Sequence, residues 1–206
     1  MGEDDVPSPI DFHDPTQARE WEEQTVKNRP YRPKFFGAFA DTLNAWFQQP
    51  FAVLELGSGS GHLAEAIMSR CPVRSYTALD FSAAMHDLAQ ARLALFRERV
   101  QFVTRDFRDA GWPTCLGSFE AVVTMQAAHK TRHKRHLVPL LAATRRCLVD
   151  SGLLLYCDHY FEPAVGKHPD LYFTRDHQAE ALRQAGFARI ERIWDEGGIA
   201  LYSASQ

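Results

Sequence analysis

One short stretch limits the possible folds of this chain more than any other. The apolar run Val53–Leu56 contains a single acid, Glu55, and leads into Gly57-Ser58-Gly59-Ser60-Gly61 and then His62. Glycines at alternate positions let a backbone turn tightly and approach a ligand closely. A helix that starts at His62 also presents free N–H groups to the same space. The stretch therefore predicts a buried strand, a glycine loop and a helix, which form either a ligand site or a plain strand–turn–helix corner.

After residue 50 the chain alternates between short apolar runs and helix-like stretches. Such alternation is typical of a parallel sheet with helices on both faces. The expected strands are Ala52–Leu56, Tyr76–Leu79, Val100–Thr104, Ala121–Met125, Leu153–Asp158, Ile190–Trp194 and Ile199–Ser203. The expected helices are His62–Arg70, Ser82–Arg97, Lys134–Leu148 and Arg175–Ala185. Only Asp195–Gly198 separates the last two strands, so we expect an antiparallel hairpin at the end of a seven-stranded, mostly parallel α/β sheet.

The first 50 residues have a helical pattern instead. Asp14-Pro15 fits a helix start with proline at the first helical position. A second helix near Pro33–Gln48 places aromatic side chains at helical spacing. We therefore expect a mobile tail over residues 1–13, a helical cap over 14–49 and one α/β domain over 50–206.

The composition is that of an ordinary globular protein. The 206 residues are 45% hydrophobic and 24% charged, with a formal net charge of −3. This balance argues for one domain and against non-specific binding to nucleic acid or anionic lipid. The four cysteines form no C-x-x-C pair, and no apolar run approaches the roughly 20 residues needed to cross a bilayer. Since the first residues also lack a secretion-signal pattern, we expect a cytoplasmic protein with reduced thiols and no membrane segment.

Two acids follow the next two expected strands. Asp80 comes some twenty residues after the glycine loop, where an acid can accept both hydroxyls of a ribose. Asp106-Phe107 follows the third strand, where an acid and an aromatic ring can hold an adenine. The carboxyl ends of neighbouring parallel strands are where open α/β sheets bind ligands. Together the three strand ends predict a nucleoside site.

These residues resemble the motifs of class I S-adenosylmethionine-dependent methyltransferases. The form E-x-G-x-G-x-G from Glu55 to Gly61 resembles motif I, and Asp80-Phe81-Ser82-Ala83-Ala84-Met85 resembles motif II. Arg105-Asp106-Phe107 resembles the adenine-binding position. Residues 146–155 resemble the helix, turn and fifth strand, with Asp150-Ser151-Gly152 where the family usually has Pro-Gly-Gly. The resemblance covers roughly residues 50–206 and implies a Rossmann-like methyltransferase fold.

The resemblance also implies a cofactor, S-adenosyl-L-methionine, and a product, S-adenosyl-L-homocysteine. The implied cofactor-binding residues are Glu55, Gly57, Ser58, Gly59, Gly61, Asp80, Phe81, Ser82, Met85, Asp106, Phe107, Met125 and Gln126. Among them the glycine loop and Glu55 would serve the methionine part, and the residues after the fourth strand would lie near the sulfonium. Two other interpretations remain open: Asp80 as a helix cap ahead of Ser82, and the aromatic and methionine side chains as core packing.

The acceptor side is less defined by sequence. His129 follows the fourth strand and is the candidate general base, because imidazole titrates near neutral pH; a packing or positioning role is the alternative. His133 and His136 would share its face if this segment is helical. That spacing suits a metal, but the interleaved lysines and arginines disfavour a cation, so we expect no metal site and instead a solvated or anion-facing surface.

The candidate substrate contacts are Trp21, Tyr31, His133, His159 and Tyr160, each with simple packing as the alternative. The loop over residues 161–172 is a candidate lid.

The leading functional hypothesis is methyl transfer to oxygen or nitrogen of a small molecule, either anionic or aromatic. A nucleic-acid (RNA) methyltransferase is the second, although an N/D-P-P-Y/F motif is missing after the fourth strand. A non-catalytic S-adenosylmethionine-binding protein is the third. A nicotinamide-dependent dehydrogenase is disfavoured because its G-x-G-x-x-G fingerprint has the third glycine one place later. The chain is expected to act as a monomer or homodimer.

Overall fold

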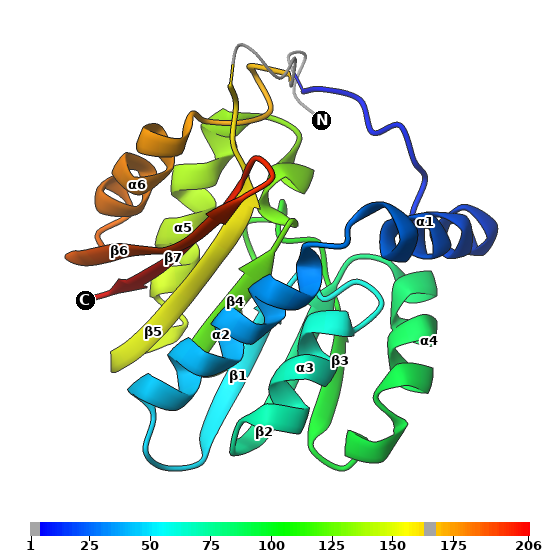
Figure 1. The fold of residues 1–206 in the computed structure, drawn as a ribbon, viewed down its shortest axis with the longest axis horizontal. Coiled ribbons are helices and arrows are strands. Elements are labelled where there is room, and N and C mark those ends of the chain that lie inside the picture. Colours follow the sequence, from blue (N-terminus) through cyan, green and yellow to red (C-terminus); the bar gives the residue numbers. More distant parts are fainter. Residues whose placement is uncertain (1–4, 163–167) are drawn as a thin grey trace.

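A computed structural model describes residues 5–162 and 168–206, and its centre is a seven-stranded sheet (Figure 1). The strand order is β3-β2-β1-β4-β5-β7-β6. The strands are β1 (Phe51–Leu56), β2 (Val73–Asp80), β3 (Val100–Thr104), β4 (Phe119–Met125), β5 (Leu148–His159), β6 (Arg189–Glu196) and β7 (Ile199–Ser205). The first five are parallel, and β7 runs antiparallel to both β5 and β6. The α/β fold expected from the sequence, with its terminal hairpin, is thus confirmed.

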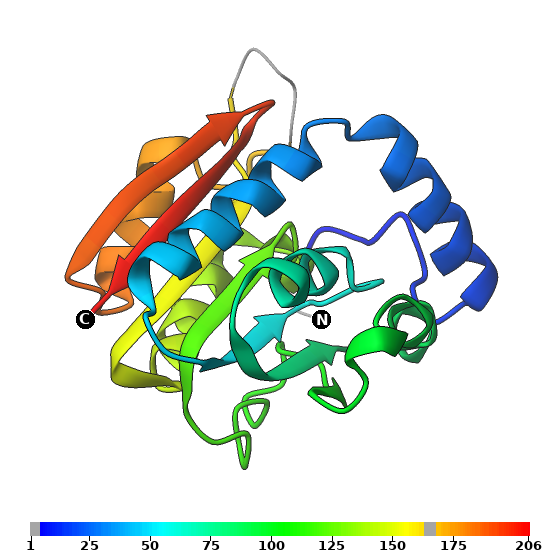
Figure 2. The same ribbon diagram turned by 60° about the horizontal axis from the view of Figure 1, so that its bottom comes forward.

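Helices cover both faces of this sheet (Figures 1 and 2). They are α1 (Pro15–Asn28), α2 (Arg32–Trp46), α3 (His62–Arg70), α4 (Ala83–Arg92), α5 (Leu137–Arg145) and α6 (Arg175–Gln184). One core cluster joins α2 and α3 to the strands, and a second joins α5 and α6 to the opposite face. The alternation along β1 explains the two cores, because Val53 points into the first and Leu54 into the second.

Two predicted helices differ from the observed ones at their ends. The helix expected to reach Arg97 stops at Arg92 and continues as a short 3₁₀ turn, η1 (Ala94–Phe96). The region after β4 forms two more 3₁₀ turns, η2 (Ala128–Thr131) and η3 (Lys134–His136), before α5 begins. Arg132 between them adopts a left-handed conformation with φ of 69°, which interrupts any continuous helix. This segment is therefore not one continuous helix, and the condition under which His129, His133 and His136 would share a face is not met.

The amino-terminal segment is also more ordered than its composition suggested. Over its described part, residues 5–13, it is held against the body of the protein. The Val6 amide donates to the Arg132 carbonyl at 2.8 Å, and the Arg132 guanidinium donates back to the Val6 carbonyl at 2.6 Å. Phe12 is buried beside α1 and α4, and its carbonyl accepts from the Ser82 hydroxyl at 2.5 Å. Over the described residues, the segment expected to be a mobile tail thus makes hydrogen bonds to the body of the protein.

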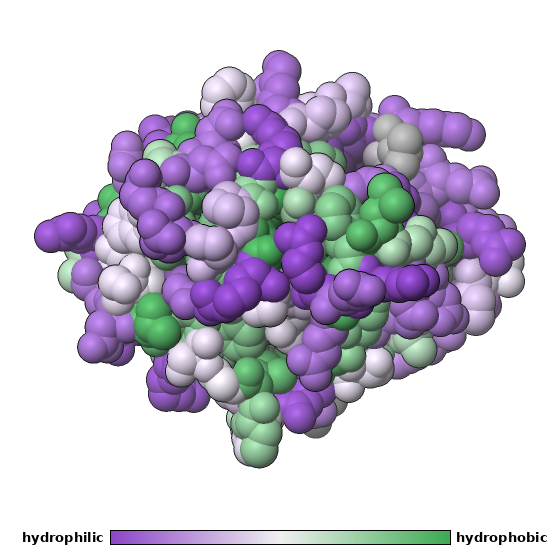
Figure 3. All heavy atoms as spheres, turned by 90° about the horizontal axis from the view of Figure 1, so that it is seen from below, coloured by the Kyte–Doolittle hydropathy of each residue, from purple (hydrophilic) through white to green (hydrophobic). Residues whose placement is uncertain are grey.

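The face at the amino ends of the parallel strands carries mainly hydrophilic side chains, with hydrophobic ones scattered among them (Figure 3). Single exposed apolar residues are normal on a soluble domain and need no partner. The cavity described below lies at the opposite edge of the sheet, where the carboxyl ends of β1 to β5 meet.

The packing of α2 on the sheet makes a testable contribution to stability. Phe39 is fully buried in the α2–α3 core, so Phe39→Ala should lower the free energy of unfolding by about 3–5 kcal/mol through lost burial and a residual cavity. The matched control is Leu95→Ala in η1, where the side chain is 93% exposed and the expected change is within ~0.5 kcal/mol. Urea unfolding measures both, and equal effects would contradict the assigned core.

Candidate active site

A cavity opens at the carboxyl ends of β1, β2 and β4. Its walls come from the glycine loop, these strand ends, the helices α1 and α2, and the turn η2. The lining residues include Phe12, Trp21, Arg29, Arg32, Glu55, Gly57, Ser58, Gly59, Ser60, Asp80, Phe81, Met85, Phe107, Met125, Gln126 and Lys130. Most residues predicted to bind the cofactor are thus placed around one space.

The glycine loop owes its shape to conformations that favour glycine. Gly57, Gly59 and Gly61 all have positive φ, at 70°, 53° and 83°. A Cβ added at Gly57 would lie 2.3 Å from the Cβ of Ala127 in the β4 exit, so any larger residue would push the two strand exits apart. The Gly57 amide donates to the Leu79 carbonyl at 2.8 Å, which ties the loop to β2.

Asp80 fixes this loop from the end of β2. Its carboxylate accepts from the Gly59 amide at 2.8 Å and from the Ser82 amide at 2.9 Å. Burial is the main cause of the raised pKa of Asp80, and these two amides oppose it. The cap of α4 itself is Ser82, whose hydroxyl accepts from the Met85 amide at 3.0 Å. Asp80 therefore organises both backbone segments while lining the cavity.

Glu55 is buried beneath the loop. The Tyr76 hydroxyl donates to its carboxyl at 2.7 Å. Burial raises the pKa of Glu55 to about 8, so its carboxyl is largely neutral at pH 7. Arg32 faces the same wall from α2, and its buried Nε has no hydrogen-bond partner among the described residues.

A residue that sequence reasoning missed joins α1 to the loop. Glu22 accepts from the Ser60 hydroxyl at 2.5 Å and from Arg92 at 2.8 Å, and contacts the His62 ring at 2.6 Å. Burial alone would raise the pKa of Glu22, but these partners lower it to about 2. Nothing in the local pattern distinguishes Glu22 from its neighbours Glu20 and Glu23, because its three partners lie at least 38 positions away.

The residues expected at the adenine end are divided between cavities. Phe81, Met85 and Phe107 line the cavity. Asp106 does not, because its carboxylate turns to Arg108, with side-chain contacts of 2.5 to 3.0 Å, and borders two neighbouring cavities. Burial by itself would raise the pKa of Asp106. The hydrogen bonds from Arg108 outweigh this effect, so the pKa lies below its ordinary value.

The exit of β4 carries local strain. Met125 and Gln126 line the cavity, and Gln126 has a φ of 55°, which costs roughly 1–2 kcal/mol for a residue with a side chain. Its Nε2 contacts His159 Nε2 at 2.9 Å, and its buried Oε1 has no partner among the described residues. Strain at such a position is typical of functional sites.

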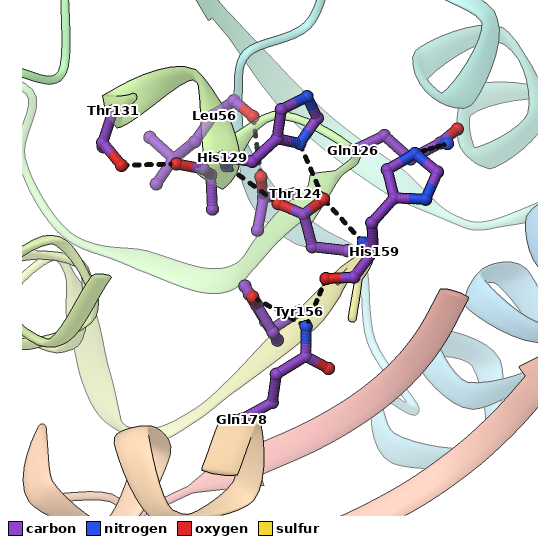
Figure 4. Close-up of polar contacts among 10 residues, drawn as sticks. Leu56, Thr124, Gln126, His129, Thr131, Tyr156, His159 and Gln178 are labelled. Carbon is purple, nitrogen blue, oxygen red and sulfur yellow. Dashed lines mark hydrogen bonds and ion pairs between the residues drawn. The ribbon is translucent and has the colours of Figure 1, made fainter. Parts of the chain in front are cut away.

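His129 is paired with a buried acid at the end of β5 (Figure 4). Asp158 Oδ1 lies 2.8 Å from His129 Nδ1, and Asp158 Oδ2 accepts from the His129 amide at 2.9 Å. Although burial raises the pKa of Asp158, the charge and hydrogen bonds of His129 hold it below its ordinary value. A carboxylate at Nδ1 keeps the proton there and leaves Nε2 as an acceptor.

The surroundings of this pair are aromatic. The His129 ring lies 5.7 Å from the His159 ring and 5.5 Å from the Tyr172 ring, between centroids. His129 and Asp158 do not line the cavity at the β4 exit, although Ala127 and Lys130 beside His129 in the sequence do; the pair borders a smaller cavity that Tyr172 also lines. The expected lid ends at Tyr172, and its residues 163–167 lie outside the described part of the chain.

Other predicted contacts of the acceptor are distributed unevenly. Trp21 lines the cavity and His159 contacts Gln126, as described above. Tyr160 is a correction, because its buried side chain donates to Asp195 at 2.9 Å and packs in the sheet core. Tyr31 packs on Phe35, and His133 accepts from the Arg135 amide; neither lines a cavity identified among the described residues.

The basic run after His129, which we predicted to form a solvated or anion-facing surface, is divided between two surroundings. Lys130 is half-buried, lines the cavity and places its Nζ 4.4 Å from the centre of the Phe12 ring. Burial lowers its pKa to about 8. Arg132 is buried and holds the amino-terminal segment through backbone carbonyls, so it does not face the cavity.

Comparison with known proteins agrees with this geometry. A family model described as a methyltransferase domain matches residues 53–152. A malonyl-[acyl-carrier protein] O-methyltransferase from Geobacter sulfurreducens is 29% identical over 169 residues, which cover 73% of this chain and 60% of that protein. The chain thus spans about 60% of the length of this curated relative.

Solved structures show the same fold. An O-methyltransferase family protein from Burkholderia thailandensis has a TM-score of 0.78 at 15% identity, covering 94% of this chain and 60% of that one. A DhpI–SAM–HEP complex has a TM-score of 0.72 at 20% identity, covering 95% and 94%.

The fold is that of an α/β protein with a Rossmann-like sheet. The chain is similar to class I S-adenosylmethionine-dependent methyltransferases, the family that its motifs resemble. S-adenosylmethionine is the cofactor of this family. Across residues 5–162 and 168–206, no helix is both long and apolar enough to cross a membrane, and no group of three or more His, Cys, Asp or Glu side chains is arranged for a metal ion.

The Glu22 network predicts a pH-dependent stability. Because its folded pKa of about 2 lies below the ordinary 4.5, Glu22 stabilises the fold above pH 4.5, and this contribution is lost as the pH falls towards 2. At pH 7, Glu22→Gln should lower the free energy of unfolding by about 2 kcal/mol, whereas Glu23→Gln on the exposed side of α1 should not. Urea unfolding between pH 3 and 7 checks this. If the difference in free energy of unfolding between wild type and Glu22→Gln stayed constant down to pH 3, the lowered pKa of Glu22 would be refuted.

Proposed function

We propose that this chain binds S-adenosylmethionine in the cavity and transfers a methyl group to an oxygen atom of a small-molecule acceptor. The observation that carries the proposal is the juxtaposition of a glycine-lined cavity with a paired histidine and acid, His129 and Asp158, at the β4 exit. The O-methyltransferase names of the relatives support oxygen as the target atom.

The unpartnered atoms of the cavity support the cofactor assignment. Arg32 Nε, Ser58 Oγ and Gln126 Oε1 are buried without a hydrogen-bond partner among the described residues. Buried polar atoms normally have partners, so three such atoms around one cavity favour a polar ligand. Arg32 suits the carboxylate of the methionine part, Asp80 suits the ribose hydroxyls, and the close approach of Gly57 to Ala127 leaves room only for a backbone surface.

In this reaction the residues of the chain align the acceptor, accept its proton and stabilise the resulting charge. When bound, the cofactor supplies a methyl group already activated by a positively charged sulfur. The cavity walls hold the acceptor in line with that group, which can account for much of the rate. His129 Nε2 accepts the proton of an acceptor hydroxyl, and Asp158 stabilises the imidazolium that results. The proton is then released from His129 to solvent.

The two helices before the sheet fit the predicted cap. We propose that residues 14–49 close the cavity from one side, since Trp21 and Arg29 of the α1 region and Arg32 of α2 line it. The Glu22 network fastens this cap to the glycine loop. Residues 50–206 then form the cofactor-binding domain.

Cofactor binding tests the first half of the proposal. Asp80→Asn should weaken the binding of S-adenosylhomocysteine at least about tenfold, because a charge-assisted hydrogen bond contributes roughly 1.5–3 kcal/mol. Asp87→Asn, in the exposed face of the same helix region, is the matched control and should bind normally. Calorimetry measures both affinities, and a wild-type affinity for Asp80→Asn would remove Asp80 from the site.

Catalysis tests the second half. His129→Gln and Asp158→Asn should each reduce methyl transfer by roughly 10²–10⁴-fold while leaving S-adenosylhomocysteine affinity unchanged. The measurement is incorporation of labelled methyl into a panel of small hydroxylated acids and phenols. Undiminished turnover in His129→Gln would contradict a general-base role. Cofactor binding by the wild-type protein without transfer to any acceptor would favour the non-catalytic alternative.

A further inference from the structure

Three basic side chains line the cavity without a carboxylate partner among the described residues. They are Arg29, Arg32 and Lys130. Elsewhere the protein pairs many of its cations, for example Arg92 with Glu22 and Arg108 with Asp106. Cations without a carboxylate partner that gather in a partly enclosed space indicate that a ligand supplies negative charge there.

The two acids that line the cavity, Glu55 and Asp80, do not balance the positive charge of its three basic side chains. Glu55 is hydrogen-bonded by Tyr76 and is largely neutral at pH 7, as described above. Asp80 already accepts from two backbone amides. The cavity therefore has a surplus of positive charge before any ligand enters.

The cofactor increases this surplus. S-adenosylmethionine carries a positive sulfonium, a positive ammonium and one carboxylate. If Arg32 binds that carboxylate, Arg29 and Lys130 remain beside an additional positive charge. Since like charges in a low-dielectric site repel strongly, the acceptor is the component left to neutralise them.

Arg29 and Lys130 lie where an acceptor would enter. Lys130 directly follows His129, and its charge is influenced by Asp80 at the ribose end and by Asp158 beneath His129. Arg29, at the end of α1, lies over the Trp21 ring at 5.5 Å and also influences Lys130. The two cations thus line the same cavity, and Lys130 interacts with the charges of both Asp80 and Asp158.

We propose that Arg29 and Lys130 form a subsite for the acid group, a carboxylate or phosphate, of a hydroxyl-bearing acceptor. This inference rests on the proposed function. It assigns the two cations to substrate specificity, and it leaves the proton transfer to His129. The Trp21 and Phe12 rings, which these cations contact, exclude water from the subsite and strengthen the pairing.

Calorimetry on the protein saturated with S-adenosylhomocysteine tests the subsite. Malonate and inorganic phosphate are the probes, and malonamide is the uncharged match for malonate. The wild type should bind at least one of the two anions and not malonamide. Lys130→Gln and Arg29→Gln should each weaken that binding about tenfold or more, because each removes a charge-assisted contact. Lys34→Gln is the control, because Lys34 pairs with Glu196 on the surface.

The pH dependence of malonate binding provides a second readout. The groups that face Lys130 are Arg29 on α1, Asp80 on β2, Arg132 after η2 and Asp158 on β5. With a pKa of about 8, Lys130 is charged below that pH and loses its charge above it. Wild-type affinity for malonate should therefore fall as the pH rises through 8. Lys130→Arg should bind malonate and keep its affinity to higher pH.

The outcomes separate this inference from the proposed function. Failure of the wild type to bind S-adenosylhomocysteine would defeat the proposed function itself. Normal cofactor binding combined with no anion binding, or with equal anion affinity in Lys130→Gln and wild type, would overturn the subsite alone. Preferential binding of an uncharged phenol under the same conditions would also overturn it, in favour of an aromatic acceptor.

Discussion

The contact between Gly57 and Ala127 is the constraint on which the site depends. Two adjacent parallel strands, β1 and β4, release their chains at this point, and a Cβ on Gly57 would come within 2.3 Å of the Ala127 side chain. The loop therefore turns away in a left-handed conformation, and its next amides face the end of β2. There Asp80 accepts from the Gly59 amide, so the close approach of the two strand exits and this hydrogen bond together shape the cavity floor.

The rest of the cavity is built by segments far apart in the sequence. The amino-terminal residues reach Arg132, the segment before α1 reaches Ser82, and α1 reaches the glycine loop through Glu22. Each contact involves a charged or hydroxyl side chain at a strand or helix end. Because these partners are buried or half-buried, their hydrogen bonds are difficult for water to replace. The amino-terminal fifth of the chain is thus part of the site rather than an appendage to it.

The sequence was informative where local physics decides the outcome. The glycine loop, the strand alternation and the terminal hairpin follow from periodicity and backbone preference, and they placed most cofactor candidates around one cavity. It failed where long-range partners decide. Tyr160 looked free beside the β5 exit, but Asp195 on β6 binds it. Lys130 and Arg132 looked alike, but the left-handed turn at Arg132 sends one side chain into the cavity and the other towards the amino terminus. Glu22 gave no local signal at all.

These placements give the site two electrostatic halves. On the cofactor half, the acids Glu55 and Asp80 are buried and engaged, so they orient groups without adding much free negative charge. On the acceptor half, Asp158 makes two hydrogen bonds with His129, and Arg29 and Lys130 form no ion pair with a carboxylate of the described residues. Because Asp158 hydrogen-bonds His129 Nδ1, the arrangement that favours a general base also leaves the positive charge of Arg29 and Lys130 to be balanced by a ligand.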